Sequence, residues 1–104
     1  MKLLEISENG GHYRNEQGKF SPIDKIGKED LLRLVNWTLH ESAVSFDEYD
    51  EKTIKNQAHQ LIYKSIAQKL GALRKRRQEF IDESARLFLT EYEKYRKDTS
   101  KNLA

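Results

Sequence analysis

The sequence predicts one α+β domain over residues 1–104, mainly α, in which a small N-terminal β-meander packs on three helices. Two observations support this class. Turn signals containing glycine separate short apolar segments within residues 2–23, as in a meander. Farther along, apolar residues recur every three or four positions, which predicts helices at about 28–40, 46–73 and 78–97. A chain of this length can bury one modest core.

Three short strands account for the predicted meander. Residues 2–6 are mostly apolar with polar flanks, and Asn-Gly-Gly at 9–11 is a turn signal because these residues tolerate positive φ. A second strand is predicted at 12–14 and a third at 19–21. Pro22 has no amide hydrogen and marks an edge or the end of pairing. A sheet this small is marginal alone, so we expect it to pack on a helix.

The first predicted helix, at 28–40, has a clear start. Gly27 can serve as the N-cap residue, and acidic residues follow in the first turn, where they suit the helix dipole. Ile26 and Leu31 occupy the positions of a hydrophobic staple. One face of this helix is apolar and comprises Leu31, Leu34, Val35 and Thr38, widened by Leu32 and Leu39.

The second predicted helix, at 46–73, has a capping-box pattern at its start. Ser45 and Glu48 have the required spacing, with Val44 and Tyr49 as the staple, although a start near Asp50 is an alternative. An apolar stripe at helical spacing follows, made of Ile54, Ala58, Leu61, Ile62, Ile66, Leu70 and Leu73.

The third predicted helix, at 78–97, carries apolar residues at alternating intervals of four and three, which is the seam of a heptad repeat. The seam consists of Ile81, Ala85, Phe88, Tyr92 and Tyr95. We expect the tail at 98–104 to fray.

The connection between the second and third helices is open to two interpretations. Gly71 could end a helix, and basic residues followed by acidic ones within 71–83 suit a helix end and a new start. We therefore favour a break or sharp kink within 71–79, with the third helix folded back on the second. The alternative is a continuous helix, because this stretch has no proline and is rich in strong helix formers. Such a helix would be too long for one small domain to cover and would require a dimer.

No set of residues in the sequence points to catalysis. The chain has no cysteine, which removes disulfides, thiolate nucleophiles and thiolate metal sites. His12, His40 and His59 lie in different predicted elements and lack metal-ligand spacing, and no phosphate-loop or nucleophile motif occurs. We therefore expect a protein that is not an enzyme and that holds no cofactor or metal.

The location expected from the sequence is the cytoplasm. No segment approaches the roughly 18 apolar residues that a membrane span needs. The residues Met1–Glu5 carry charges where a signal peptide would have an apolar run.

A basic block is the first candidate binding feature. Residues 61–104 carry 11 basic and 6 acidic residues, whereas residues 1–60 carry 8 basic and 11 acidic residues. The densest part could neutralise phosphates as a polyanion patch, made of Lys69, Arg74, Lys75, Arg76 and Arg77. However, the chain has a net charge of only +2 and no nucleic-acid-binding motif, so nucleic-acid binding is the alternative function.

The heptad seam defined above is the second candidate. A short first helix cannot cover its full length, and Tyr combines apolar area with a polar tip that suits interfaces. The sequence therefore favours a non-catalytic protein–protein interaction or assembly module, whose partner is another protein or a second copy in a homodimer.

Overall fold

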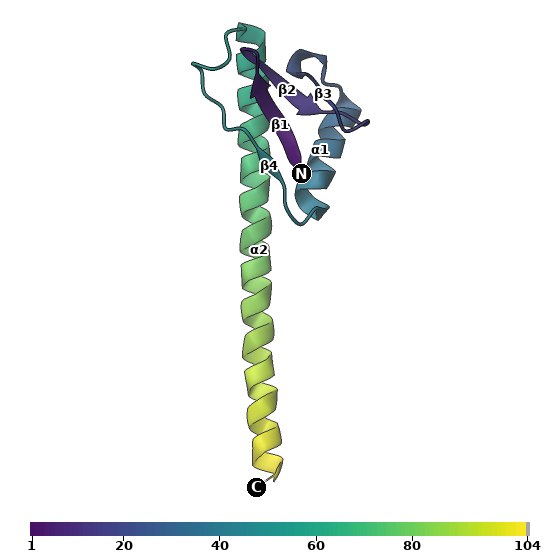
Figure 1. The fold of residues 1–104 in the computed structure, drawn as a ribbon. Coiled ribbons are helices and arrows are strands. Elements are labelled where there is room, and N and C mark those ends of the chain that lie inside the picture. The colour runs from purple at the N-terminus through teal and green to yellow at the C-terminus, as the bar shows by residue number, and fades with distance from the viewer. Residues whose placement is uncertain (104) are drawn as a thin grey trace. The chain divides into compact units, whose positions relative to one another are not determined.

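The computed structural model describes the backbone of residues 1–103 and the side chains of residues 1–94. It confirms the predicted α+β class and shows a four-stranded mixed sheet, one short helix and one long helix (Figure 1). The chain contains two compact units, Met1–Arg74 and Lys75–Ala104. That all 104 residues form one domain stays a prediction. The elements are β1 Lys2–Ser7, β2 Gly10–Arg14, β3 Phe20–Pro22, a 3-10 turn η1 at Ile23–Lys25, α1 Lys28–His40, β4 Ser45–Phe46 and α2 Gln57–Leu103.

The strand order in the sheet is β3-β2-β1-β4. The first three strands form the predicted antiparallel meander, in which Leu4 pairs with Tyr13. Glu8 and Asn9 form the turn between β1 and β2, with φ of 51° and 63°. Two successive residues with positive φ are typical of a tight hairpin turn. The glycines Gly10 and Gly11 therefore begin β2 instead of making the turn, which is a correction to the predicted strand boundary.

The core lies in the unit Met1–Arg74. Leu3 and Leu4 of β1 are both fully buried, and neighbouring strand residues point to opposite faces, so both faces of β1 are covered. The remaining core side chains come from β2, η1, α1, the segment before α2 and its first turns. They are Tyr13, Ile23, Leu34, Ile54, Tyr63, Ile66, Ala67 and Leu70.

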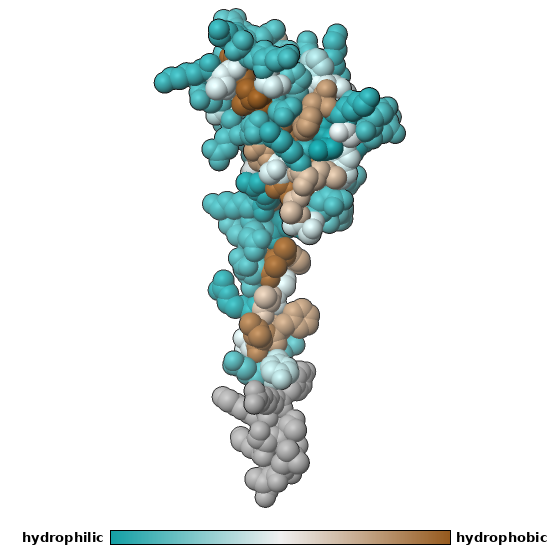
Figure 2. All heavy atoms as spheres, viewed as in Figure 1, coloured by the Kyte–Doolittle hydropathy of each residue, from teal (hydrophilic) through white to brown (hydrophobic). Residues whose placement is uncertain are grey.

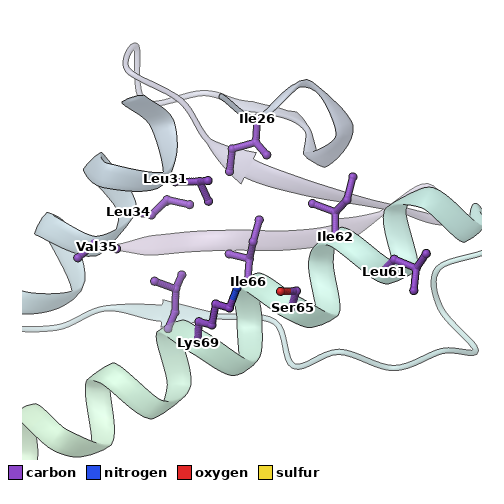
Figure 3. Close-up of a pocket in the computed structure, with 10 residues that line it drawn as sticks. Ile26, Leu31, Leu34, Val35, Leu61, Ile62, Ser65, Ile66 and Lys69 are labelled. Carbon is purple, nitrogen blue, oxygen red and sulfur yellow. The ribbon is translucent and has the colours of Figure 1, made fainter. Parts of the chain in front are cut away.

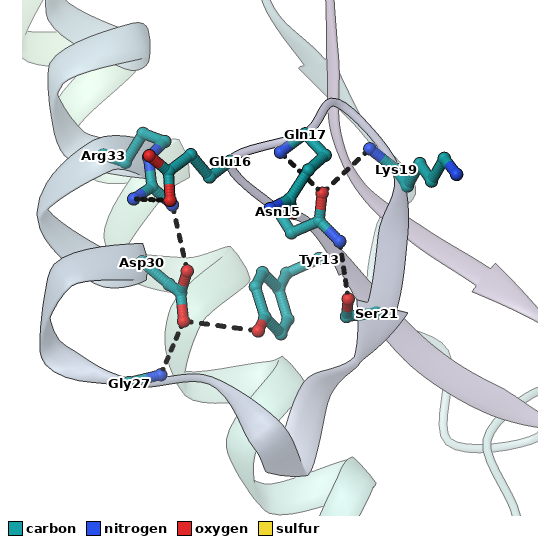
Figure 4. A network of polar contacts seen from close by, with 9 residues as sticks. All are labelled: Tyr13, Asn15, Glu16, Gln17, Lys19, Ser21, Gly27, Asp30 and Arg33. Atoms are coloured by element: carbon teal, nitrogen blue, oxygen red, sulfur yellow. Dashed lines mark hydrogen bonds and ion pairs between the residues drawn. The ribbon is translucent and has the colours of Figure 1, made fainter.

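Helix α1 runs from Lys28 to His40, as predicted, with Gly27 as its N-cap residue. Asp30 fixes this end of the helix (Figure 4). Its carboxylate accepts hydrogen bonds from the Gly27 amide at 2.9 Å, the Arg33 guanidinium at 2.9 Å and the Tyr13 hydroxyl at 3.2 Å. The start of α1 is thereby joined to β2. The Gly27 amide, together with Arg33 and Tyr13, holds the pKa of Asp30 below its ordinary value.

The predicted helix start at residue 46 is wrong. Ser45 and Phe46 form β4, which pairs in parallel with β1, and α2 begins only at Gln57. The reason lies in the long-range partner. The Asp47 carboxylate accepts a hydrogen bond from the Ile6 amide at 2.9 Å and lies 3.1 Å from the Lys2 ammonium. This segment therefore supplies polar partners to the edge of β1. Pairing with the edge of β1 is therefore favoured over the helix start that the local capping pattern predicts.

The true N-cap of α2 is Asn56, whose side-chain oxygen accepts the His59 amide at 3.2 Å. The favoured break within 71–79 and the separate helix at 78–97 are also wrong, because α2 is continuous from Gln57 to Leu103. No Ser, Thr, Asp or Asn that could cap a new helix occurs at 71–79, and apart from Gly71 its residues are Lys, Arg, Ala, Leu, Gln and Glu, which all favour helix. The predicted fraying at 98–104 lies outside the described side chains.

Replacement of Gly71 tests the continuity of α2. Gly71 lies within the helix, and a Cβ added there would make only an ordinary contact with Phe46, at 3.8 Å. We expect Gly71→Ala to raise the free energy of unfolding by about 0.5–1 kcal/mol, since alanine loses less backbone entropy in a helix. Gly18→Ala is the control and should destabilise, because Gly18 has φ of 80°. Urea denaturation followed by circular dichroism measures both. Destabilisation by Gly71→Ala would show that the helix ends there.

The Asp30 network makes the stability depend on pH. Because the pKa of Asp30 in the folded chain lies below its ordinary value of 3.8, its carboxylate stabilises the fold above about pH 4. This contribution is lost as the pH falls through the lowered pKa. Asp30→Asn should therefore reduce stability at neutral pH, and its difference from the native chain should shrink in acid. Glu29→Gln, a neighbouring exposed position, is the control. Equal pH dependence in Asp30→Asn and the native chain would contradict the expectation.

Candidate functional site

The unit Met1–Arg74 contains an apolar groove between α1 and the first turns of α2, with a volume of about 530 Å³. Figure 3 shows Leu31 and Leu34 extending from α1 towards the side on which Ile62 and Ile66 project from α2. Ser65 and Lys69 are the polar residues that line it, together with Ile26, Val35, Leu61 and Leu70. The groove can accept an apolar group and offers one cation, the Lys69 ammonium.

Apolar side chains in the groove and elsewhere on α1 are exposed. Leu61 is 75% exposed, and Leu32 on α1 is 54% exposed. Leu31 and Leu39 are also exposed, although less so. Large contiguous apolar surfaces of this kind are uncommon on chains that act alone and mark contact sites.

A second apolar surface lies on α2 within the unit Lys75–Ala104. Figure 2 shows its hydrophobic groups on the outside of this segment. We call it the apolar face of α2. It consists of six large side chains that are 45–73% exposed, namely Phe80, Ile81, Leu87, Phe88, Leu89 and Tyr92. The described part of the predicted seam, Ile81, Ala85, Phe88 and Tyr92, lies on it and is exposed throughout. The Tyr95 side chain lies outside the described residues.

The apolar face of α2 is unusually wide. With 3.6 residues per turn, the arc from Leu87 through Phe88 to Leu89 covers about 200° of the helix circumference. An ordinary amphipathic helix has an apolar stripe of about 100°. Charged and polar residues such as Asp82, Arg86 and Thr90 occupy the rest of the circumference, and Ser84 and Glu91 interrupt the arc between Leu87 and Phe88. A single neighbouring helix would therefore leave part of this face exposed.

The residues of the predicted polyanion patch are divided between the two units of the chain. Lys69 lines the groove, whereas Arg74 donates to the Val44 carbonyl at 3.3 Å and lies 5.0 Å from the Phe46 ring centre. Both of these residues belong to Met1–Arg74, and on α2 they are five residues apart, which places them on different faces. Lys75, Arg76 and Arg77 follow on α2 in the second unit, and Lys75 and Arg76 are exposed.

The ionisable groups that the fold brings together have structural partners. His59 accepts the Gly11 amide at 3.2 Å and lies 3.4 Å from Asp24, whereas His12 contacts Ser7. Burial works to raise the pKa of Asp47, but the Ile6 amide and Lys2 outweigh it and the pKa falls. Among residues 1–94, no group of three or more histidines and carboxylates could hold a metal ion.

In the described part of the chain, no helix is both long and apolar enough to cross a membrane. Comparison of the chain with protein-family models, with curated proteins and with solved structures finds no match. The functional argument therefore depends on the two apolar surfaces.

Sequence reasoning identified the apolar face of α2 and missed the groove. A partial signal for the groove is present in the sequence, because Leu31, Leu34 and Val35, which line it, lie on the predicted apolar face of the helix at 28–40. The pattern could not show that α1 and α2 leave a space between them.

The basic block provides a prediction about nucleic acid. Arg74 is held by Val44 and Phe46, and acidic residues crowd the next turns of α2, so Arg76→Ala with Arg77→Ala should leave affinity for DNA and RNA unchanged. Fluorescence anisotropy at about 150 mM salt measures this, because weak non-specific contacts are screened there. Sub-micromolar binding by the native chain that collapses in the double variant would instead favour the alternative, nucleic-acid-binding function.

Proposed function

We propose that this chain is a non-catalytic protein–protein interaction or assembly module, and that the apolar face of α2 is its contact surface. The observation that supports this is the exposure of six large apolar side chains within thirteen residues of one helix, between Phe80 and Tyr92. Covering each such side chain removes apolar area from water and contributes about 1.5–3 kcal/mol. Association is the direct way to gain this free energy.

The spacing of the side chains on the apolar face of α2 supports self-association as the main form of contact. Ile81, Ala85, Phe88 and Tyr92 repeat at intervals of four, three and four residues, which lets two helices interlock their side chains. The arc of about 200° is wider than one helix covers, so the assembled form places more than one neighbouring element against it. A second copy supplies these elements, and a different protein is the alternative partner.

A matched pair of substitutions tests the contact surface. Phe88 is 73% exposed on the apolar face of α2, so Phe88→Glu should not disturb folding but should weaken association at least about tenfold. Thr90→Glu adds the same charge to the polar side of the same helix and should leave association nearly unchanged. Analytical ultracentrifugation over micromolar concentrations measures both, and circular dichroism confirms that the variants fold.

Two results would contradict the proposal. One is a native chain that stays monomeric at every concentration and captures no protein partner through Phe88. The other is equal weakening by Phe88→Glu and Thr90→Glu, because a general effect of added negative charge would then explain the loss.

A further inference from the structure

We propose that the apolar groove between α1 and α2 receives residues 79–93 of a second copy of this chain. This inference rests on the proposed function and specifies the surface that the apolar face of α2 meets. The groove is concave, has a volume of about 530 Å³ and is lined mostly by apolar side chains. The segment 79–93 offers a convex helix with apolar side chains on a broad arc. These are the two halves of helix-in-groove recognition.

Spacing along the helix fits this mode of binding. Ile81, Phe88 and Tyr92 stand at positions i, i+7 and i+11 and thus project from one side of α2. Helices that bind in grooves use anchors at such positions. On the receiving side, Leu61 of the groove lining and Leu32, the neighbour of Leu31 on α1, are both exposed, so a long occupant covers more apolar surface than a small apolar molecule does.

The charges of the two surfaces are complementary. Lys69 lines the groove, and Lys28 is exposed on α1 one turn before Leu31 and Leu32, on the same side of the helix. The segment 79–93 carries one basic residue, Arg86, and five acidic residues, Glu79, Asp82, Glu83, Glu91 and Glu93. Attraction between lysines and carboxylates brings these surfaces together.

The same charges disfavour the simplest alternative, in which two copies of 79–93 pair directly. The carboxylates that flank the seam, Asp82 and Glu91, would then lie near those of the other copy, and like charges across an interface are destabilising. Reciprocal exchange avoids this repulsion. Each chain has one groove and one segment 79–93, so we propose that two chains exchange them reciprocally, which leaves neither surface open, instead of continuing into a filament.

Cross-linking between chains tests the arrangement directly, because the native chain has no cysteine and each introduced thiol is unique. One full-length variant carries Ser65→Cys in the groove, and a second carries Ala85→Cys on the apolar face of α2. The two differ in tag size, are mixed in equal amounts and are treated with a short bis-maleimide reagent. We expect a dominant cross-linked species of mixed mass. Pairing Ser65→Cys with Thr90→Cys, on the polar side of α2, is the control and should cross-link several-fold less.

The outcomes separate this inference from the proposed function. Self-association with cross-links only between two Ala85→Cys chains would overturn the groove as the receiving surface and leave the interaction module intact. Monomers at all concentrations, with no cross-link, would overturn the groove inference and, with it, self-association as the form of contact. Equal cross-linking by the Ala85→Cys and Thr90→Cys chains would show contact without specific docking and would also overturn the groove.

Two groove substitutions provide an independent measurement. Leu61→Glu changes a side chain that is 75% exposed, so the fold should persist while dimer affinity falls at least about tenfold. Lys69→Glu should slow association and reduce its salt dependence, since it removes attraction at the groove. Gln68→Glu, exposed on α2 but outside the groove, is the matched control. Native affinity in Leu61→Glu would overturn the proposal.

Discussion

The buried side chain of Tyr63 is the contact on which the arrangement of residues 1–74 depends. Its ring lies so close to Gly11 that an added Cβ would come within 2.6 Å of Cδ2, so only glycine allows β2 to approach α2 this closely. Its hydroxyl donates to the Asp47 carbonyl, which satisfies a fully buried phenol and holds the segment after β4 against α2. Burial raises the pKa of Tyr63 and keeps it neutral. This contact fixes the first turns of α2, which form one side of the groove.

The sequence-based prediction succeeds where the stabilising interactions join residues close in the chain, and it fails where they join distant segments. Helix α1 was predicted at its observed bounds because Gly27 and Asp30 act within one turn of each other. A helix was predicted from residue 46 because the capping pattern there is local, yet Ser45 and Asp47 pair with Met1 and with Leu4 and Ile6 of β1. A pattern confined to neighbouring residues carries no information on such distant pairing. The continuity of α2, by contrast, was weighed as an alternative on helix propensity alone.

The two apolar surfaces also differ in how far the sequence alone predicts them. The heptad spacing of Ile81 and Phe88 is visible in the sequence, but only the structure shows that these side chains are exposed. A periodic pattern identifies an apolar face and does not say whether the same chain covers it. The groove was not predicted, because it arises where α1 and α2 pack around the core and leave a space. The exposure of Leu61 and Leu32 therefore had to come from the structure.

Electrostatics and apolar burial have separate roles in the contact that these surfaces imply. The half of the chain at 61–104 is basic overall, yet five of its six acidic residues lie at 79–93, between basic stretches. Because charges more than about 8 Å apart are largely screened at physiological salt, a partner responds to this local acidic segment and not to the net charge. Apolar area supplies most of the free energy of association but does not discriminate between apolar surfaces. In the contact that we propose, the lysines at the groove and the carboxylates at 79–93 would determine which of these surfaces meet.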